Sequence, residues 1–369
     1  MKILQFVEGG PRYGAAVSIR NLVSGLVELG VDVRFAAYRG RPMAEEMRAA
    51  GIPVTEIDAR SKLDPRAIRQ LRELVASQGI QVLHTHLSSA TINGAMAGRI
   101  SRVPVVSTVH GMNRKWTYGF SSHIIAVSQA VKRHLVGQGV APEKISVVYN
   151  GIPMPALSDL PSPAEAKAAL GIPRSAPVYG TVSRAHLNKG IQFALRAMPA
   201  ILRAQPEARY VFLGDGKHLA ELKTEASSLG LGERAIFLGF RDQVYPVLRA
   251  MDIFVFPSLM EAMGISAVEA MAAGVPVVAS DVGGIPEVIG DGLGVLVPAG
   301  NTDRIAEECV RLFADAELRS GLAHAARESA LDRFTTRKSA EGVLAVYELL
   351  ARRALASGTA SARAEARRS

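Results

Sequence analysis

The chain is poor in cysteine, since its 369 residues contain only Cys309. An internal disulfide is therefore excluded, and such sparse use of cysteine suits a reducing cytosol. Long apolar runs are missing as well, because none reaches the roughly 18 residues that a membrane span needs. Residues 1–7 form a short strand-like run that lacks the apolar core and cleavage site of a signal peptide. We therefore expect a cytoplasmic protein that meets a membrane, if at all, peripherally at its cytoplasmic face.

The signatures of nucleic-acid binding are also missing. The chain has no clustered basic helix, no set of stacking aromatics and no zinc-ligand spacing, although its net charge is +9. The charge is uneven, because residues 1–160 hold 19 Lys and Arg against 11 Asp and Glu. This basic part favours an anionic partner, for which we expect a phosphorylated acceptor or an anionic lipid surface and no nucleic acid. The alternative is that these cations are solvated and serve solubility.

The order of the strand-like runs indicates two similar halves. A chain of this length, with 48% hydrophobic residues, is long enough for two cores. In both halves short apolar runs alternate with helical stretches, which is typical of a parallel sheet covered on both faces. The expected strands are 2–7, 32–37, 82–84, 105–109, 124–127 and 146–149 in the first half, and 178–182, 210–213, 235–238, 253–256, 275–279 and 294–297 in the second. Two Rossmann-like domains follow, with ligands at the carboxyl ends of their strands.

A proline-rich stretch from 151 to 177 marks the boundary between the halves. We therefore expect an N-terminal domain over 1–160 and a C-terminal domain over 161–335. A helix over 336–356 should follow the second domain, and the small, polar and basic residues 357–369 predict a disordered tail.

The most informative segment is 257–279, which carries two acids. It follows an apolar run, crosses a loop that contains Glu261, enters an Ala-rich helical stretch that contains Glu269 and continues into another strand-like run. If both acids were helical, their eight-residue offset would separate them by about 12 Å along the axis. The paired carboxylates of glycoside hydrolases are only about 5 to 9.5 Å apart, so we expect these acids to contact different parts of one long ligand. The alternative is an ordinary amphipathic helix with a solvated Glu269.

The start of this helix suits an anion. If the helix begins near Gly264, the amides of Met263, Gly264 and Ile265 are first-turn donors without helical partners, and the positive end of the helix dipole lies behind them. Such a terminus suits phosphate or diphosphate. A nucleotide sugar combines a sugar ring, a diphosphate and a ribose with two hydroxyls, and it therefore fits this pattern of donors and acids.

Segment 257–279 resembles the E-x7-E motif of retaining glycosyltransferases with the GT-B fold, in glycosyltransferase family 4, also called group 1. The resemblance places Glu261 beside the donor sugar, as a catalytic residue, and Glu269 on the ribose hydroxyls. The common family sequence E-G-F-G is Glu261-Ala262-Met263-Gly264 here, which keeps the acid and the last glycine. Met263 in place of Phe changes the expected shape of the sugar pocket.

A second match is the R-x4-K pair of the same family, formed here by Arg184 and Lys189. In relatives both cations neutralise the donor diphosphate, and two fixed cations beside a helix terminus can replace a metal. No Asp-x-Asp sequence occurs in the chain, which argues against the metal-dependent donor binding of GT-A enzymes. We therefore expect no metal and no cofactor, and a donor of the UDP- or GDP-sugar type. The alternative is an ordinary surface Arg and Lys on a loop.

Three further segments match the donor side of the family. Gly214 lies in a glycine turn at the expected edge of the donor pocket, although turns use glycine routinely. Arg241 ends the segment 237–241, whose backbone contacts the nucleotide base in relatives. Segment 280–287 matches a part that supports the domain, and we interpret it as structural.

In the first half the resemblance assigns residues to the sugar and the acceptor. The flexible glycine loop after the first strand corresponds to Arg12-Tyr13-Gly14, so we expect Gly14 to approach the donor phosphates and Arg12 and Tyr13 to meet the acceptor. His110 follows a strand in a T-x-H-G context, where relatives carry a histidine that reaches the transferred sugar. His86 also follows a strand and is expected to line the cleft near the acceptor. The alternative for His110 is an ordinary turn or core residue.

The resemblance spans nearly the whole chain and implies an α/β protein with the GT-B fold. Two Rossmann-like domains would face each other across a cleft, and a C-terminal helix would cross back to the first domain. The implied activity is retaining transfer of a hexose or N-acetylhexosamine from a nucleoside diphosphate sugar to an acceptor hydroxyl, in the synthesis of cell-envelope glycolipid, lipopolysaccharide or polysaccharide. The basic first domain favours a sugar, lipid-linked or lipopolysaccharide-type acceptor.

Two alternatives to a glycosyltransferase stay open. One is a nucleotide-sugar epimerase of the same fold, which would convert the donor without any acceptor. The other is a non-catalytic protein that binds sugar nucleotides, against which intact Arg184, Lys189 and Glu261 argue.

Overall fold

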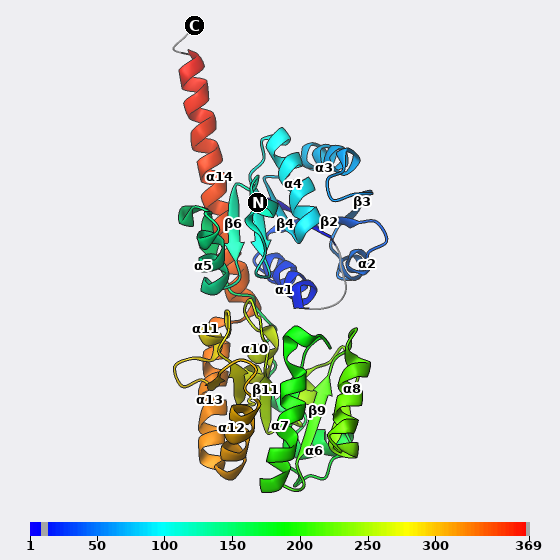
Figure 1. The fold of residues 1–369 in the computed structure, drawn as a ribbon. Helices are drawn as coiled ribbons and strands as arrows, with labels where there is room; N and C mark the ends of the chain where they lie inside the picture. Colours follow the sequence, from blue (N-terminus) through cyan, green and yellow to red (C-terminus); the bar gives the residue numbers. More distant parts are fainter. Residues whose placement is uncertain (9–13, 367–369) are drawn as a thin grey trace. The chain divides into compact units, whose positions relative to one another are not determined.

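The computed structural model describes residues 1–8 and 14–366 of the chain (Figure 1). It divides into two compact units. Unit 1 consists of Met1–Gly151 together with the C-terminal segment from Thr336, and unit 2 is Ile152–Thr335. Unit 2 is therefore inserted between two parts of unit 1. Each unit contains one parallel β-sheet covered by helices.

The sheet of unit 1 has seven strands in the order β3-β2-β1-β4-β5-β6-β7. The strands are β1 (Lys2–Val7), β2 (Asp32–Tyr38), β3 (Val54–Ile57), β4 (Val82–His86), β5 (Val105–Val109), β6 (His123–Ala126) and β7 (Ile145–Val147). Sequence analysis did not predict β3, because Thr55 and Glu56 interrupt the apolar run of this edge strand. The chain leaves β1 on one side for β2 and later enters β4 on the other side, so the topological switch point lies between β1 and β4.

Helices cover both faces of this sheet. Successive side chains of its central strands point alternately into two cores, one on each face. Ile3 and Val7 of β1 belong to a core with α1, α2 and α14, whereas Leu4 and Phe6 belong to a core with α3 and α4. Gln5 falls on the face of Ile3 and Val7. The helices are α1 (Gly14–Glu28), α2 (Pro42–Ala49), α3 (Pro65–Gln78), α4 (Ser88–Ser101), α5 (Gln129–Gly137) and α14 (Thr336–Ala366), with 3-10 turns η1 (Lys115–Tyr118) and η2 (Pro142–Lys144).

Helix α14 joins unit 1 through an apolar stripe. Ala340, Val343, Tyr347 and Leu350 are buried and recur every three or four residues, as one face of a helix does. The predicted return of this helix to the first domain is confirmed. The helix continues to Ala366, so residues 357–366 are helical where the sequence predicted a disordered tail. Alanine, which recurs in this segment, is the strongest helix former.

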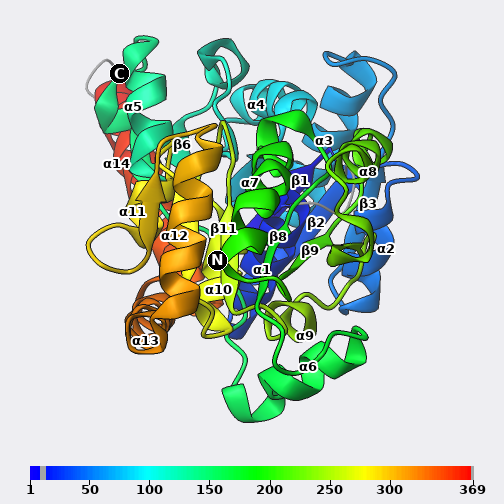
Figure 2. The same cartoon turned by 60° about the horizontal axis from the view of Figure 1, so that its bottom comes forward.

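The sheet of unit 2 has six strands in the order β10-β9-β8-β11-β12-β13, with its switch point between β8 and β11. Helices α7, α8 and α12 share a core with one face of the sheet, and Figure 2 shows α7 and α12 side by side over it. The strands are β8 (Val178–Val182), β9 (Arg209–Leu213), β10 (Ala235–Phe237), β11 (Ile253–Phe256), β12 (Val277–Ser280) and β13 (Val295–Val297). The helices are α6 (Pro163–Ala169), α7 (Ile191–Ala204), α8 (Leu219–Ser228), α9 (Tyr245–Leu248), α10 (Ile265–Ala272), α11 (Ile285–Ile289), α12 (Thr302–Ala314) and α13 (Ala316–Arg333), with 3-10 turns η3 (Leu157–Asp159), η4 (Leu187–Lys189) and η5 (Gly232–Arg234).

The boundary between the units falls at Gly151 and Ile152 instead of the expected 160 and 161. The Ile152 amide donates to the Phe334 carbonyl at 2.9 Å. The Tyr245 hydroxyl donates to the Pro153 carbonyl, also at 2.9 Å. These bonds attach the first residues of the proline-rich stretch to unit 2.

No helix in the described part of the chain combines the length and the apolarity that crossing a membrane requires.

The packing of α14 on α1 predicts a steric effect at Gly25. A Cβ at this position would lie 2.9 Å from the Cβ of Ala340 and from two atoms of Thr336, so Gly25→Ala should destabilise the protein by about 1–3 kcal/mol. The matched control is Gly137→Ala in α5, where a Cβ meets nothing within 4 Å and stability should stay unchanged or rise. Urea unfolding measures both, and equal stability of the two variants would contradict the close contact.

Candidate active site

The carboxyl ends of β8 and β11 bring the charged residues of unit 2 together at its switch point. Lys189 follows β8 and Glu261 follows β11, 72 residues later. Their side chains form an ion pair with 2.5 Å between Nζ and Oε2, and they are only 14% and 15% exposed. The ammonium also lies 6.0 Å from the centre of the Phe256 ring. The structure therefore joins two residues that the sequence assigned separately.

Glycines bring the loops around this pair into main-chain contact. Gly190 has a φ of +69°, and a Cβ there would lie 1.8 Å from the carbonyl oxygen of Pro257. Gly283 has a φ of +56°, and its Cβ would lie 1.8 Å from the carbonyl oxygen of Glu261. The same oxygen accepts from the Gly284 amide at 3.2 Å. The segment 280–287 thus contacts the backbone of Glu261 and holds it in place.

A third glycine contact holds the loop that carries Arg184. A Cβ at Gly214 would lie 1.8 Å from the carbonyl oxygen of Ser183, and the Gly214 amide donates to the Gly239 carbonyl at 2.9 Å. Gly214 therefore connects the Arg184 loop to the segment that ends at Arg241. Arg184 and Arg241 are exposed.

Helix α10 begins as predicted, with Gly264 as its N-cap in the left-handed conformation and Ile265 as its first residue. Met263 is buried, with 2% of the residue exposed, so its side chain packs within unit 2.

Glu269 lies one turn into α10 and is partly buried. Loss of hydration raises the pKa of its carboxyl from 4.5 to about 7. Tyr245 is close enough that its own pKa is raised, first by burial and then by the charge of Glu269. A desolvated carboxylate of this kind is suited to accept hydrogen bonds from ligand hydroxyls.

The histidines of unit 1 belong to a buried polar chain on the α14 face of the sheet. His84 Nδ1 lies 2.5 Å from the Tyr347 hydroxyl, and His84 Nε2 lies 2.7 Å from Thr108 Oγ1. His86 Nε2 lies 2.8 Å from Gln5 Oε1. These residues share one face because side chains two apart in a strand point the same way.

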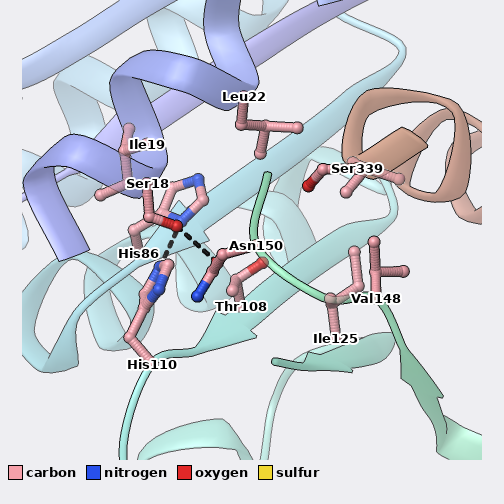
Figure 3. Close-up of a pocket in the computed structure, with 11 residues that line it drawn as sticks. Ser18, Ile19, Leu22, His86, Thr108, His110, Ile125, Val148, Asn150 and Ser339 are labelled. Atoms are coloured by element: carbon pink, nitrogen blue, oxygen red, sulfur yellow. Dashed lines mark hydrogen bonds between the residues drawn. The ribbon is translucent and has the colours of Figure 1, made fainter. Parts of the chain in front are cut away.

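His110 joins this chain at the carboxyl end of β5. Its Nε2 lies 3.1 Å from His86 Nδ1, and Figure 3 shows the two rings beside Ser18, which hydrogen-bonds to Asn150. These four residues border a small cavity of about 10 Å³, which is room for about one water molecule. His86 and His110, assigned separately in the sequence, are therefore direct neighbours.

The orientation of the Gln5 amide determines where the hydrogens lie along this hydrogen-bond chain. The Gln5 amide nitrogen donates to the Tyr347 hydroxyl at 2.8 Å, so the amide oxygen accepts from His86 Nε2. A neutral His86 that donates from Nε2 accepts at Nδ1, and His110 must therefore donate from its Nε2. The Nδ1 lone pair of His110 is buried and has no partner within the described residues. With the Gln5 amide in this orientation, the hydrogen-bond partners select the Nε2–H tautomer of His110.

Burial keeps these imidazoles neutral. Loss of hydration lowers the pKa of His84 to about 3 and that of His110 to about 4, and it lowers the pKa of His86 well below the ordinary value. At neutral pH these three imidazoles therefore donate and accept hydrogen bonds without carrying charge.

The remaining predictions for unit 1 have different outcomes. Gly14 is exposed and is the first residue of α1. Arg12 and Tyr13 lie outside the described residues. Sequence reasoning missed Gln5 and Tyr347, for which the available signal was a polar residue at the centre of the apolar strand β1.

No group of three or more His, Cys, Asp or Glu side chains suited to a metal occurs among the residues that the structure describes.

Comparison with known proteins identifies the family. The model of "Glycosyl transferases group 1" matches residues 163–329, and that of "Glycosyltransferase Family 4" matches residues 13–154. Phosphatidyl-myo-inositol mannosyltransferase of Mycobacterium leprae is 30% identical over 322 residues, which are 82% of this chain and 83% of the relative. The chain belongs to the group 1 glycosyltransferases. Its enzyme class is therefore that of a glycosyltransferase, as the sequence predicted.

A further relative and a solved structure are also similar to this chain. The UDP-Gal:alpha-D-GlcNAc-diphosphoundecaprenol alpha-1,3-galactosyltransferase of Escherichia coli is 28% identical over 275 residues, 68% of this chain and 71% of the relative. The crystal structure of Anabaena HepE in complex with UDP superposes with a TM-score of 0.83 at 23% identity and covers 94% of this chain and 100% of HepE. The GT-B fold predicted from the sequence is confirmed.

The raised pKa of Glu269 predicts a pH-dependent stability. A carboxyl that ionises near 4.5 when unfolded and near 7 when folded destabilises the fold increasingly as the pH rises from 4.5 through 7. Glu269→Gln should therefore raise the melting temperature by about 2–4 °C at pH 8 and change it little at pH 5. Differential scanning fluorimetry at both pH values tests this, with the exposed Glu233→Gln as the control. The same shift at both pH values would contradict the prediction.

The hydrogen-bond chain predicts the effect of a carboxylate at position 5. Gln5→Glu should raise the pKa of His86, because an anion at its Nε2 favours the doubly protonated ring. Protonated His86 donates from Nδ1, so His110 must accept at Nε2 and carry its hydrogen on Nδ1. Long-range ¹H–¹⁵N NMR reads both tautomers, and Tyr347→Phe, which adds no charge, should leave His110 as in the wild type. An Nδ1–H tautomer of His110 in the wild-type protein would refute the assignment.

Proposed function

We propose that this glycosyltransferase transfers a hexose or N-acetylhexosamine, with retention at the anomeric carbon, from a UDP- or GDP-sugar to an acceptor hydroxyl. The observation that carries the proposal is the Lys189–Glu261 ion pair at the switch point of unit 2. A cation suited to a diphosphate and an anion suited to an electron-poor sugar are held there in contact, where open α/β sheets bind ligands.

In the proposed donor complex the cations meet the diphosphate. Arg184 and Lys189 neutralise the phosphates, beside the N-terminus of α10. Glu269 accepts hydrogen bonds from the ribose hydroxyls, which replace the hydration that burial has removed from its carboxylate. The backbone around Gly214, Gly264 and Ile265 lies along the same edge of the sheet and completes the donor site.

The proposed reaction takes place on one face of the sugar. The bond between the anomeric carbon and the phosphate oxygen breaks, the acceptor oxygen forms its bond on the same face, and the departing phosphate oxygen takes the acceptor proton. Glu261 stabilises the oxocarbenium-like charge that develops on the sugar ring. His110, neutral and with an open Nδ1, accepts a hydrogen bond from a hydroxyl of the transferred sugar. The leaving-group charge is balanced by Arg184 and Lys189, and we propose that no metal is required.

The proposed acceptor is a lipid-linked or lipopolysaccharide-type glycan of the cell envelope. Two relatives support this class by their names, which specify phosphatidyl-myo-inositol and a diphosphoundecaprenol-linked sugar. A nucleotide-sugar epimerase is the alternative within the fold, and it would convert the donor in the absence of any acceptor.

Glu261→Gln separates binding from chemistry. The variant should lower turnover by about 100-fold or more, because it removes charge stabilisation at the reacting carbon. Donor affinity should stay unchanged or increase, since Lys189 is released from its ion pair and becomes available to the diphosphate. Isothermal titration and single-turnover rates measure the two quantities, with Glu233→Gln as the matched control. Equal losses of affinity and turnover would contradict the role of Glu261.

Lys189→Ala tests donor binding without a metal. Saturation-transfer NMR with UDP-, GDP- and ADP-sugars in EDTA should detect one donor with wild-type protein and lose it in the variant, because a diphosphate cation is missing. Release of the nucleoside diphosphate and the anomeric coupling of the product report turnover and retention. Loss of activity in EDTA that added Mg²⁺ restores would refute metal independence, and donor binding without turnover would favour a non-catalytic protein.

A further inference from the structure

Unit 1 contains a long stretch of chain without acidic residues. Between Glu73 and Glu143 the 69 intervening residues include no Asp or Glu but six Lys and Arg. Arg99, Arg102 and Lys115 belong to this stretch, are exposed and pair with no carboxylate within the described residues. The positive charge of this part of the molecule is therefore not balanced locally.

Large apolar side chains lie among these cations. Ile100, at the end of α4, is 48% exposed, and Trp116 and Phe120, on and just after η1, are 58% and 54% exposed. The Arg99 guanidinium lies 5.9 Å from the centre of the Phe120 ring. Since η1 packs against α4, the cations and the apolar side chains form one surface.

Buried neighbours and hydrogen bonds hold the turn that carries Trp116. Thr117 and Tyr118 are buried, and the Tyr118 hydroxyl accepts from Asn113 Nδ2 at 2.8 Å. The Lys115 amide donates to Gln138 Oε1 at 2.8 Å. With its neighbours held in this way, the indole is displayed outward by a fixed backbone instead of packing into the core.

We propose that this aromatic–basic surface, formed by Arg99, Ile100, Arg102, Lys115, Trp116 and Phe120, docks the protein on an anionic lipid bilayer. Tryptophan and phenylalanine favour the interfacial layer of a bilayer, where an apolar ring can be buried while polar atoms stay hydrated. Arginine and lysine beside them gain from the negative potential of anionic headgroups. An aliphatic Ile100 between the cations suits acyl chains better than it suits the stacked bases of single-stranded nucleic acid.

The link between this aromatic–basic surface and the acceptor rests on the proposed function, because a lipid-linked acceptor is presented at a bilayer surface. Binding itself is measured without turnover, so the two proposals fail separately. A protein that binds vesicles but no nucleotide sugar contradicts only the activity, and one that transfers sugar to a soluble acceptor without binding vesicles contradicts only the docking.

The chain supplies its own probe, because Trp116 is its one tryptophan. With full-length protein and phosphatidylcholine vesicles that contain about 30 mol% phosphatidylglycerol, Trp116 emission should shift to the blue and be quenched by brominated acyl chains. Pure phosphatidylcholine vesicles should give neither change, and about 0.5 M NaCl should reverse both. An unchanged spectrum with anionic vesicles, or a shift that appears only with single-stranded RNA, overturns the proposal.

Variants separate the two components of the surface. Arg99→Gln with Arg102→Gln should lower partitioning into anionic vesicles about 30-fold, and Phe120→Ala should lower it about tenfold. The matched controls in unit 1 are Arg72→Gln and Leu63→Ala, of which Leu63 is 55% exposed, and both should bind as the wild type does. Circular dichroism and thermal melting verify that each variant is folded. Equal losses in the controls would show that binding does not depend on this surface.

Discussion

The close approach of backbones that only glycine permits determines the geometry of unit 2. The loops after β8, β11 and β12 meet at Gly190 and Gly283, where a neighbouring carbonyl oxygen occupies the space that a Cβ needs. Lys189 and Glu261 extend from these same loops and form their ion pair. Because main-chain contacts of this kind cannot relax by changing a rotamer, the backbone that carries the two charged side chains is held in place.

Unit 1 achieves order by different means. Gln5, His84 and His86 occupy core-facing positions of two central strands, where apolar side chains are usual, and they satisfy one another with the help of Tyr347. Burial keeps the imidazoles neutral, so each ring nitrogen has one defined role as donor or acceptor. One unit thus presents fixed charges and the other presents fixed neutral hydrogen-bonding groups.

The sequence was sufficient for most of the fold because parallel strands buried on both faces read as short apolar runs. It failed at β3, where Thr55 and Glu56 obscure the pattern, and at the domain boundary, because prolines mark an irregular segment without indicating which unit binds it. For the site, the motifs predicted Glu261, but the contact between Glu261 and the Gly283 loop joins separate segments and cannot be read from the sequence. Tyr347 escaped notice because its partner Gln5 is 342 residues away and its helix reads as ordinary amphipathic sequence.

The insertion of unit 2 between two parts of unit 1 has a consequence for biosynthesis. On the ribosome, the α1 surface that receives α14 stays uncovered until α14 has been made. Unit 2 is continuous and can complete its core while unit 1 still lacks a helix. The usual order, in which the N-terminal domain matures first, therefore does not apply to unit 1, which needs residues from after unit 2 to complete its core. A chain whose translation stops before Tyr347 combines a finished second unit with a first unit whose apolar face is open to chaperones and proteases.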